Sequence, residues 1–266
     1  MNSKVQSAAF LVALLFCTNA DASPSSCPEN FFEGQAPNLV DSKLATKSRE
    51  ICYSEYAILH SGLTRTPLYS ADHLTSLRVS VAEQQLRSDS SQTFHEEVSL
   101  PVDERSWLRD YSRSGYDRGH MTPNGDFDNA KAQGESFTLA NMIPQDPNNN
   151  RGLWMRLEVA TRALAQKYGE VWVVTVPIFA GAQTKWLHNR VAIPAKIAKA
   201  IYVPALKGAA AYLVDNAPGD AWQAISIAQL RDLSNIDVFP ALPEDMKRQI
   251  IQLPAPSDRK SKWGGF

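Results

Sequence analysis

The 266-residue sequence has few of the residues that build metal clusters, with only three cysteines and five histidines. It contains no Cys-x-x-Cys pair, no His-x-x-x-His spacing and no His-Glu-x-x-His motif. A structural zinc site and a zinc peptidase centre of that type are therefore not indicated. The composition is also too balanced for a disordered, collagen-like or coiled-coil chain.

The sequence also lacks an excess of positive charge. Its 27 lysines and arginines face 28 aspartates and glutamates, and the formal net charge is -1. The protein as a whole therefore does not attract polyanions. A nucleic-acid partner would have to be held by a local basic patch or by a bound cation.

Long hydrophobic runs are absent except near the N-terminus. Residues 8–17 form an apolar run of ten, preceded by Lys4 and followed by Ala20-Asp21-Ala22. Ten residues are too few for a membrane-spanning helix, which needs about 20. The pattern predicts a secretory signal peptide over residues 1–22, cleaved after Ala22, and a periplasmic or secreted protein without a membrane anchor. An uncleaved anchor is the alternative.

The cysteines fit an exported protein. Cys17 lies within the predicted signal peptide, which leaves Cys27 and Cys52 as an even pair. An even pair in an oxidising compartment predicts a disulfide, here between an N-terminal arm at 23–50 and the start of the core. Two free buried thiols are the alternative.

The rest of the chain predicts one α+β domain over residues 51–253, followed by a mobile tail at 254–266. Apolar and β-branched segments predict strands, Leu and Ala at spacings of three and four predict helices, and Gly169 is a helix stop. The predicted strands lie at 51–60, 66–69, 135–143, 171–179, 190–204 and 209–214, and the predicted helices at 71–88, 150–168, 226–233 and 243–251. Residues 88–115 are expected to form a loop.

The stretch from Ser114 to Asp126 concentrates groups that can do chemistry. His120 has an imidazole whose ordinary pKa lies near neutrality, so it can take a proton from water. Arg118 offers donors that suit phosphate oxygens, and Asp117 could orient either neighbour. The alternative is a surface turn with an incidental histidine, because a four-residue string recurs by chance.

A second group follows at the start of the predicted helix. Asn150 offers an amide oxygen to a hard cation, and Mg²⁺ takes only one or two protein oxygens. Glu158 lies eight residues later, within roughly 80° of Asn150 around a regular helix, so it could reach the ion through a water molecule. The alternatives are that Asn150 only caps the helix and that Glu158 faces solvent or pairs with Arg162.

Taken together, these groups resemble one known family. The string Tyr-Asp-Arg-Gly-His-Met at 116–121, Asn141, and the pattern Asn-Arg-Gly-x-Trp-x-Arg-x-Glu at 150–158 resemble the DNA/RNA non-specific endonuclease family. This is the secreted ββα-metal nuclease type found in bacteria and in mitochondrial endonuclease G. The intervals of 21, nine and eight residues between His120, Asn141, Asn150 and Glu158 also match. The resemblance covers about residues 50–215, including 60–68 and 191–194.

The resemblance implies an α+β fold of the ββα-metal (His-Me finger) type, on a central, mostly antiparallel sheet with flanking helices. It implies Mg²⁺-dependent hydrolysis of DNA and RNA to 5′-phosphate and 3′-hydroxyl ends, with Mn²⁺ as an alternative ion. His120 would activate water, and Asn150 would be the direct protein ligand of the ion.

The family pattern also implies supporting roles. Asn141 and Glu158 would support the active site, and Arg118 would stabilise charge on the phosphate. An upstream arginine also lies near the scissile phosphate in the family; Arg87 holds that place here, with a longer interval to Phe94 than usual.

Two other classes of function remain open at this point. One is an exported nucleic-acid-binding protein without activity, which needs arginines but not His120 and Asn150 together. The other is a different metal-dependent phosphohydrolase, which usually has several carboxylate or histidine ligands at short spacing.

Overall fold

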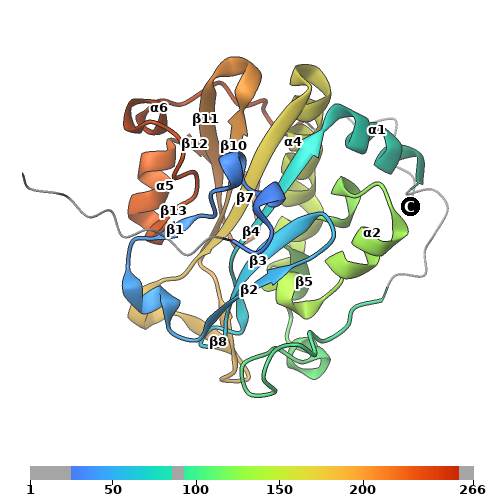
Figure 1. The fold of residues 1–266 in the computed structure, drawn as a ribbon. Coiled ribbons are helices and arrows are strands. Elements are labelled where there is room, and N and C mark those ends of the chain that lie inside the picture. Colours follow the sequence, from blue (N-terminus) through green and yellow to red (C-terminus); the bar gives the residue numbers. More distant parts are fainter. Residues whose placement is uncertain (1–24, 86–92, 258–266) are drawn as a thin grey trace, which may run out of the picture.

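The computed structural model describes residues 25–85 and 93–257. Its centre is a seven-stranded sheet in which every neighbouring pair is antiparallel (Figure 1). In spatial order the strands are β12 (Trp222–Ile225), β11 (Gly208–Asp215), β10 (Lys196–Val203), β7 (Glu170–Ile178), β4 (Thr66–Thr75), β3 (Tyr56–Ser61) and β2 (Ser48–Cys52). No helix within the described residues is long and apolar enough to cross a membrane.

The middle strands are covered on both faces, which explains their continuous apolar sequence. In β7, Val174 and Val176 belong to the hydrophobic cluster on one side, and Val171 and Val173 belong to the cluster on the other. Figure 1 shows α5 and α6 on one side of the sheet and α1, α2 and α4 on the opposite side. The domain therefore has three layers with two hydrophobic cores.

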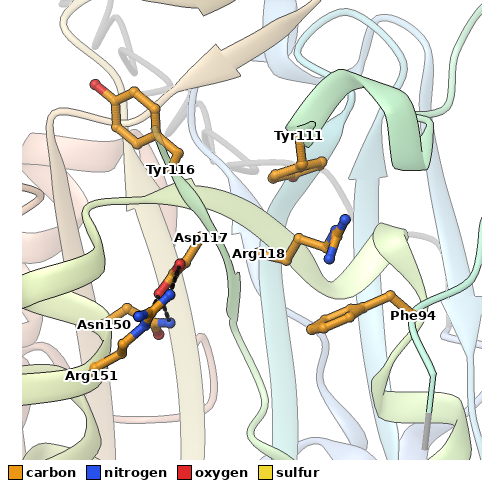
Figure 2. Close-up of a pocket in the computed structure, with 7 residues that line it drawn as sticks. All are labelled: Phe94, Tyr111, Tyr116, Asp117, Arg118, Asn150 and Arg151. Carbon is orange, nitrogen blue, oxygen red and sulfur yellow. Dashed lines mark hydrogen bonds and ion pairs between the residues drawn. The ribbon is translucent and has the colours of Figure 1, made fainter. Parts of the chain in front are cut away.

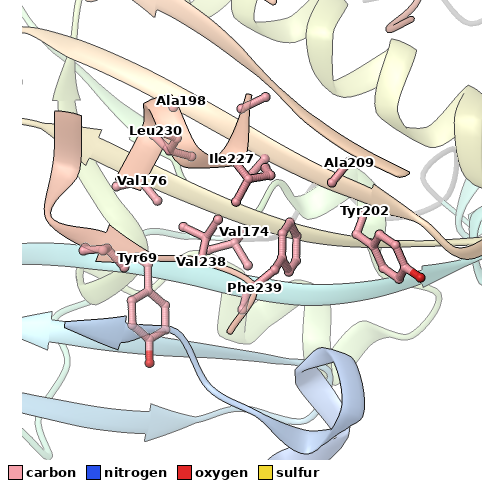
Figure 3. Packing of buried hydrophobic residues seen from close by; sticks show 14 of the residues in the cluster. Tyr69, Val174, Val176, Ala198, Tyr202, Ala209, Ile227, Leu230, Val238 and Phe239 are labelled. Atoms are coloured by element: carbon pink, nitrogen blue, oxygen red, sulfur yellow. The ribbon is translucent and has the colours of Figure 1, made fainter. Parts of the chain in front are cut away.

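The first core lies under α5 (Ile227–Ser234) and α6 (Glu244–Arg248). Figure 3 shows Ile227 and Leu230 of α5 directed at the valines and alanines of β7 and β10. Ser226 and Gln229 form a capping box that begins α5, so the backbone N–H groups at its start are satisfied. The short strands β1 (Asn38–Leu39) and β13 (Ile236–Asp237) pair beside this layer.

The second core carries the ββα unit. Strands β5 (Asp117–His120) and β6 (Met142–Gln145) form an antiparallel pair, and the chain then enters α3 (Pro147–Asn149), a π-helical turn at Asn150–Trp154 and α4 (Met155–Tyr168). Gly169 ends α4 with a φ of 94°, a conformation that glycine adopts without steric cost. The other elements of this side are α1 (Ser76–Gln85), α2 (Ala130–Ser136), β8 (Lys185–Leu187) and β9 (Val191–Ile193).

Four local expectations were wrong. The predicted strand at 190–204 is two strands, β9 and β10, which belong to different sheets. The segment 51–60 is two strands, because the chain reverses between β2 and β3, where the N–H of Tyr53 donates to the carbonyl of Tyr56. The first part of the predicted helix at 71–88 extends β4, and α1 begins at Ser76. The predicted strand at 135–143 is the end of α2 and a 3₁₀ turn at Leu139–Asn141, and β6 begins only at Met142.

The expected disulfide is present between Cys27 and Cys52. It ties the N-terminal arm to β2, and the arm then packs Phe31 against Tyr69 and Phe32 against Tyr202. The arm is therefore part of the folded domain. The predicted signal peptide at 1–22 and most of the predicted tail lie outside the described residues.

We predict that replacing both cysteines with serine lowers the free energy of unfolding by about 3 kcal/mol. The bond closes a loop with a sequence separation of 25 residues, and its loss increases the entropy of the unfolded chain by that order. Urea unfolding monitored by fluorescence measures the difference. Wild-type protein in reductant should match the double variant, and an unchanged midpoint would contradict the prediction.

Candidate active site

The β5–β6 hairpin sets the position of the residues at 117–120. Gly119 lies opposite Ile143, and His120 lies opposite Met142 at the end of the strand. A Cβ atom at Gly119 would lie 1.9 Å from Oε1 of Gln145, so no larger residue fits without moving that side chain. Gln145 in turn donates from Nε2 to Oδ1 of Asn149, at 2.8 Å. The glycine thus allows the hairpin to pack against the start of the helix.

His120 is held among aromatic rings. Its imidazole lies edge-on to Phe137, with the centroids 5.0 Å apart, and 5.7 Å from Phe94. Nε2 is buried and has no hydrogen-bond partner among the described residues. Burial lowers the pKa of His120 to about 4. The imidazole is therefore neutral at pH 7 and able to accept a proton.

Asn141 fixes the backbone that follows His120. Its Oδ1 accepts from the N–H of Thr122 at 3.0 Å, and its Nδ2 donates to the carbonyls of Thr122 and Ser136, at 2.8 and 2.9 Å. The N–H of Met121 donates to the carbonyl of Asn141 as well. Because both its oxygen and its nitrogen are hydrogen-bonded to backbone groups, the amide of Asn141 holds the loop that follows His120.

Arg118 lies between two aromatic rings, as Figure 2 shows. Its guanidinium carbon is 4.8 Å from the centroid of Phe94 and 5.9 Å from that of Tyr111. The side chain borders a cavity of about 330 Å³, whose lining residues are Phe94, Tyr111, Tyr116, Asp117, Arg118, Asn150 and Arg151. No carboxylate among the described residues forms a salt bridge with Arg118, so its charge is available to an anion in this cavity.

Asp117 joins the hairpin to the helix (Figure 2). It accepts two hydrogen bonds from Arg151, at 2.8 and 2.6 Å, and one from Nδ2 of Asn150, at 3.0 Å. Burial raises the pKa of Asp117, but the hydrogen bonds from Arg151 and Asn150 outweigh it and leave the pKa below its ordinary value. With Nδ2 turned to Asp117, Oδ1 of Asn150 accepts no hydrogen bond from the described residues.

The helix begins earlier than the sequence indicates, and Asn150 does not cap it. Asp146 is the N-cap, and its Oδ1 accepts from the N–H groups of Asn148 and Asn149. Residues 150–154 form a π turn, so the angle between Asn150 and Glu158 differs from that of a regular helix. Asn149 is buried and Asn148 is exposed, which leaves Asn150 as the asparagine that borders the cavity.

Glu158 lies deeper in the domain and has charged neighbours. Burial raises its pKa to about 7, against the opposing effect of Lys199 and Arg162. Arg162 forms its ion pair with Asp126, at 2.7 Å, and no ion pair with Glu158 is seen within the part of the chain that the structure describes. Lys199 is buried and donates to Thr175, at 2.9 Å. Glu158 therefore keeps a carboxylate that no hydrogen-bonded cation has neutralised.

These observations match one family. The sequence corresponds to the DNA/RNA non-specific endonucleases over residues 35–245. The chain belongs to this family. The match covers both cores and every described element of the candidate site.

Individual proteins named as nucleases are similar to the chain. It is 32% identical over 222 residues to the mitochondrial nuclease EXOG of Danio rerio, and the match covers 76% of this chain and 63% of that protein. It is 27% identical over 237 residues to a nuclease of a Nostoc species, covering 82% of each. The chain thus spans less than two thirds of the EXOG relative.

Solved structures show the same fold. A chain in the crystal structure of the EndoG/EndoGI complex superposes with a TM-score of 0.65 at 24% identity, covering 75% of this chain and 92% of that chain. The expected ββα-metal fold on an antiparallel sheet is therefore confirmed.

Sequence reasoning missed several parts of this candidate site. The Asp117–Arg151 pair, the Asp126–Arg162 pair, Lys199 and the rings around His120 come from separate segments, and their spacing carries no signal. Of the residues named from the sequence, Asp117, Arg118 and Asn150 line one cavity. His120 lies against Phe94, which also lines it, whereas Asn141 and Glu158 are not among its lining residues. Arg87 lies outside the described residues.

We predict that Asn141→Leu lowers the free energy of unfolding by roughly 3 kcal/mol or more, because each buried group left unpaired costs about 1–3 kcal/mol. The substitution removes the partners of the Thr122 N–H and of two carbonyls. Urea unfolding measures the loss. Asn148→Leu, at an exposed position in the same part of the fold, is the matched control, and equal losses in both variants would contradict the role assigned to Asn141.

Proposed function

We propose that this endonuclease-family protein is exported and hydrolyses phosphodiester bonds of DNA and RNA with Mg²⁺, leaving 5′-phosphate and 3′-hydroxyl ends. The observation that carries the proposal is the neutral imidazole of His120 beside a cavity lined by Arg118 and Asn150. A base, an unpaired guanidinium and a free amide oxygen are the groups that phosphodiester hydrolysis requires.

His120 acts as the general base in this proposal. A pKa of about 4 keeps the ring unprotonated throughout the neutral range. The aromatic rings of Phe94 and Phe137 restrict its movement, so the proton acceptor keeps one position relative to the hairpin. The attacking water would lose its proton to this ring.

Arg118 binds the phosphate. The guanidinium lies between the rings of Phe94 and Tyr111 and forms no salt bridge with a described residue, so its charge remains for a phosphate. As negative charge grows on the phosphate oxygens, a preorganised guanidinium stabilises it without reorganising. Contacts to phosphate carry no base information, and this supports cleavage of DNA and RNA without sequence preference.

The residues at the cavity fit a Mg²⁺ ion, with Asn150 as the protein ligand. Oδ1 of Asn150 borders the cavity and accepts no hydrogen bond from the described residues, while Nδ2 is fixed on Asp117. A single amide oxygen suits Mg²⁺, which retains most of its waters. When bound, the ion would add positive charge at the scissile phosphate. Glu158 would support the ion from behind Asn150, and Mn²⁺ is an alternative ion.

Export is supported by the signal-peptide pattern at residues 1–22 and by the Cys27–Cys52 disulfide, since disulfides persist in oxidising compartments. The similar EXOG protein is described as mitochondrial. Fractionation of the native host would separate a periplasmic or secreted location from an intracellular one.

We predict that His120→Ala lowers the rate of plasmid and RNA cleavage by about 10²- to 10⁴-fold, the usual contribution of a positioned base. Conversion of supercoiled plasmid and release of acid-soluble nucleotides from RNA measure the rates. His95→Ala, at an exposed histidine, should cut at the wild-type rate. Near-wild-type cutting by His120→Ala would exclude this residue as the base.

We predict that Asn150→Ala raises the Mg²⁺ concentration needed for half-maximal cleavage by at least about tenfold, since even indirect partners of a metal site alter its affinity by that factor. EDTA should stop cleavage by the wild-type protein, and excess Mg²⁺ should restore it. Asn148→Ala is the matched control. The ligand assignment fails if both variants give the wild-type Mg²⁺ dependence.

A further inference from the structure

A stack of one tryptophan and two arginines lies beside the candidate active site. The guanidinium carbon of Arg190 is 3.5 Å from the ring centroid of Trp107, and that of Arg109 is 3.9 Å from the same centroid. At such short distances both groups must lie nearly above the ring centre. They cannot share one face without overlapping, so they cover opposite faces of Trp107.

Hydrogen bonds hold the side of the stack that contains Arg190. Asp110 is buried; it accepts from the backbone N–H of Trp107 at 2.8 Å and from Nε of Arg190 at 3.1 Å. Nη2 of Arg190 donates to the carbonyl of Arg105, at 3.3 Å. These bonds fix Arg190 and the tryptophan ring. Arg109, on the outer face, is exposed and forms no salt bridge with any described residue.

A third arginine, Arg65, contacts the backbone of Arg190. Nη1 of Arg65 donates to the carbonyl of Arg190 at 2.6 Å. Burial, followed by the nearby charge of Arg190, lowers the pKa of the Arg65 guanidinium. Asp110 forms an ion pair with Arg190, so Arg109 is the arginine of the stack that no described carboxylate neutralises.

The stack is connected to the cavity through Tyr111. This residue directly follows Asp110, lines the cavity and lies beside Arg118. It also packs in one hydrophobic cluster with Leu187 and Val191. These two residues pair across β8 and β9 next to the turn that carries Arg190. Arg118 and the stack are thus separated only by the Asp110–Tyr111 pair.

We propose that the Arg109–Trp107–Arg190 stack binds phosphate groups of the nucleic-acid strand next to the scissile bond. This inference rests on the proposed function and adds a second contact to it. Both faces of Trp107 are covered, so no base can stack on the ring, and the outward groups are guanidinium N–H donors. The surface therefore contacts the backbone of DNA or RNA without regard to sequence.

The test measures binding separately from cleavage. In the His120→Ala background with EDTA, fluorescence anisotropy follows the binding of labelled single-stranded DNA and RNA of about 20 nucleotides, longer than one such surface covers. Adding Arg109→Glu should weaken binding by about tenfold and make the slope of log affinity against log salt shallower by about 0.7, the value for one lost contact on a single strand.

Two controls complete the experiment. Arg248→Glu reverses the same charge at an exposed position of α6, on the other side of the sheet, and should change binding little. Arg109→Lys should retain most of the affinity. Unchanged binding by Arg109→Glu, or an equal loss in Arg248→Glu, would overturn the proposal. Plasmid cutting by His120→Ala at the wild-type rate would instead contradict the proposed function. The anisotropy measurement would still test whether the stack binds nucleic acid.

Discussion

The site depends on how the β5–β6 hairpin is fastened to the loop and helix around it. Asn141 uses all its amide hydrogen-bonding groups on the backbone after His120, and Gln145 reaches across Gly119 to Asn149. The first contact positions the loop after His120, and the second positions the start of the helix that carries Asn150. Because both originate in the same short hairpin, the imidazole of His120 and the amide of Asn150 keep a fixed relation.

The charged groups behind the site follow from burial. Glu158 and Asp126 lie where water is scarce, and an isolated carboxylate there would take up a proton. Arg162 binds Asp126 directly, and the charges of Lys199 and Arg162 oppose the rise in the pKa of Glu158. These cations limit the rise in the pKa of Glu158 without forming an ion pair with it.

The sequence predicts those features of the fold and the candidate site that depend on residues close together in the chain. The fold type and the disulfide follow from short patterns and the intervals between them, and the same patterns include Asp117, Arg118 and Asn150, which line one cavity. The N-cap at Asp146 was missed although it is local, since an aspartate followed by proline is itself a helix-start pattern. The π turn after it and the helical beginning of the 135–143 segment were missed because tertiary packing overrode local propensity. The Asp126–Arg162 pair joins residues 36 positions apart, which no spacing rule selects.

A protein with a formal net charge of -1 can hold a polyanion only if its local cations are not already neutralised. A carboxylate fixes an arginine but cancels its charge, whereas an aromatic ring fixes it and leaves the charge intact. This chain uses rings at the two arginines that face substrate in our proposals, with Phe94 and Tyr111 around Arg118 and Trp107 under Arg109. The same arrangement occupies the ring faces on which bases would otherwise stack. In our proposals, affinity for phosphate and indifference to sequence therefore have one physical origin.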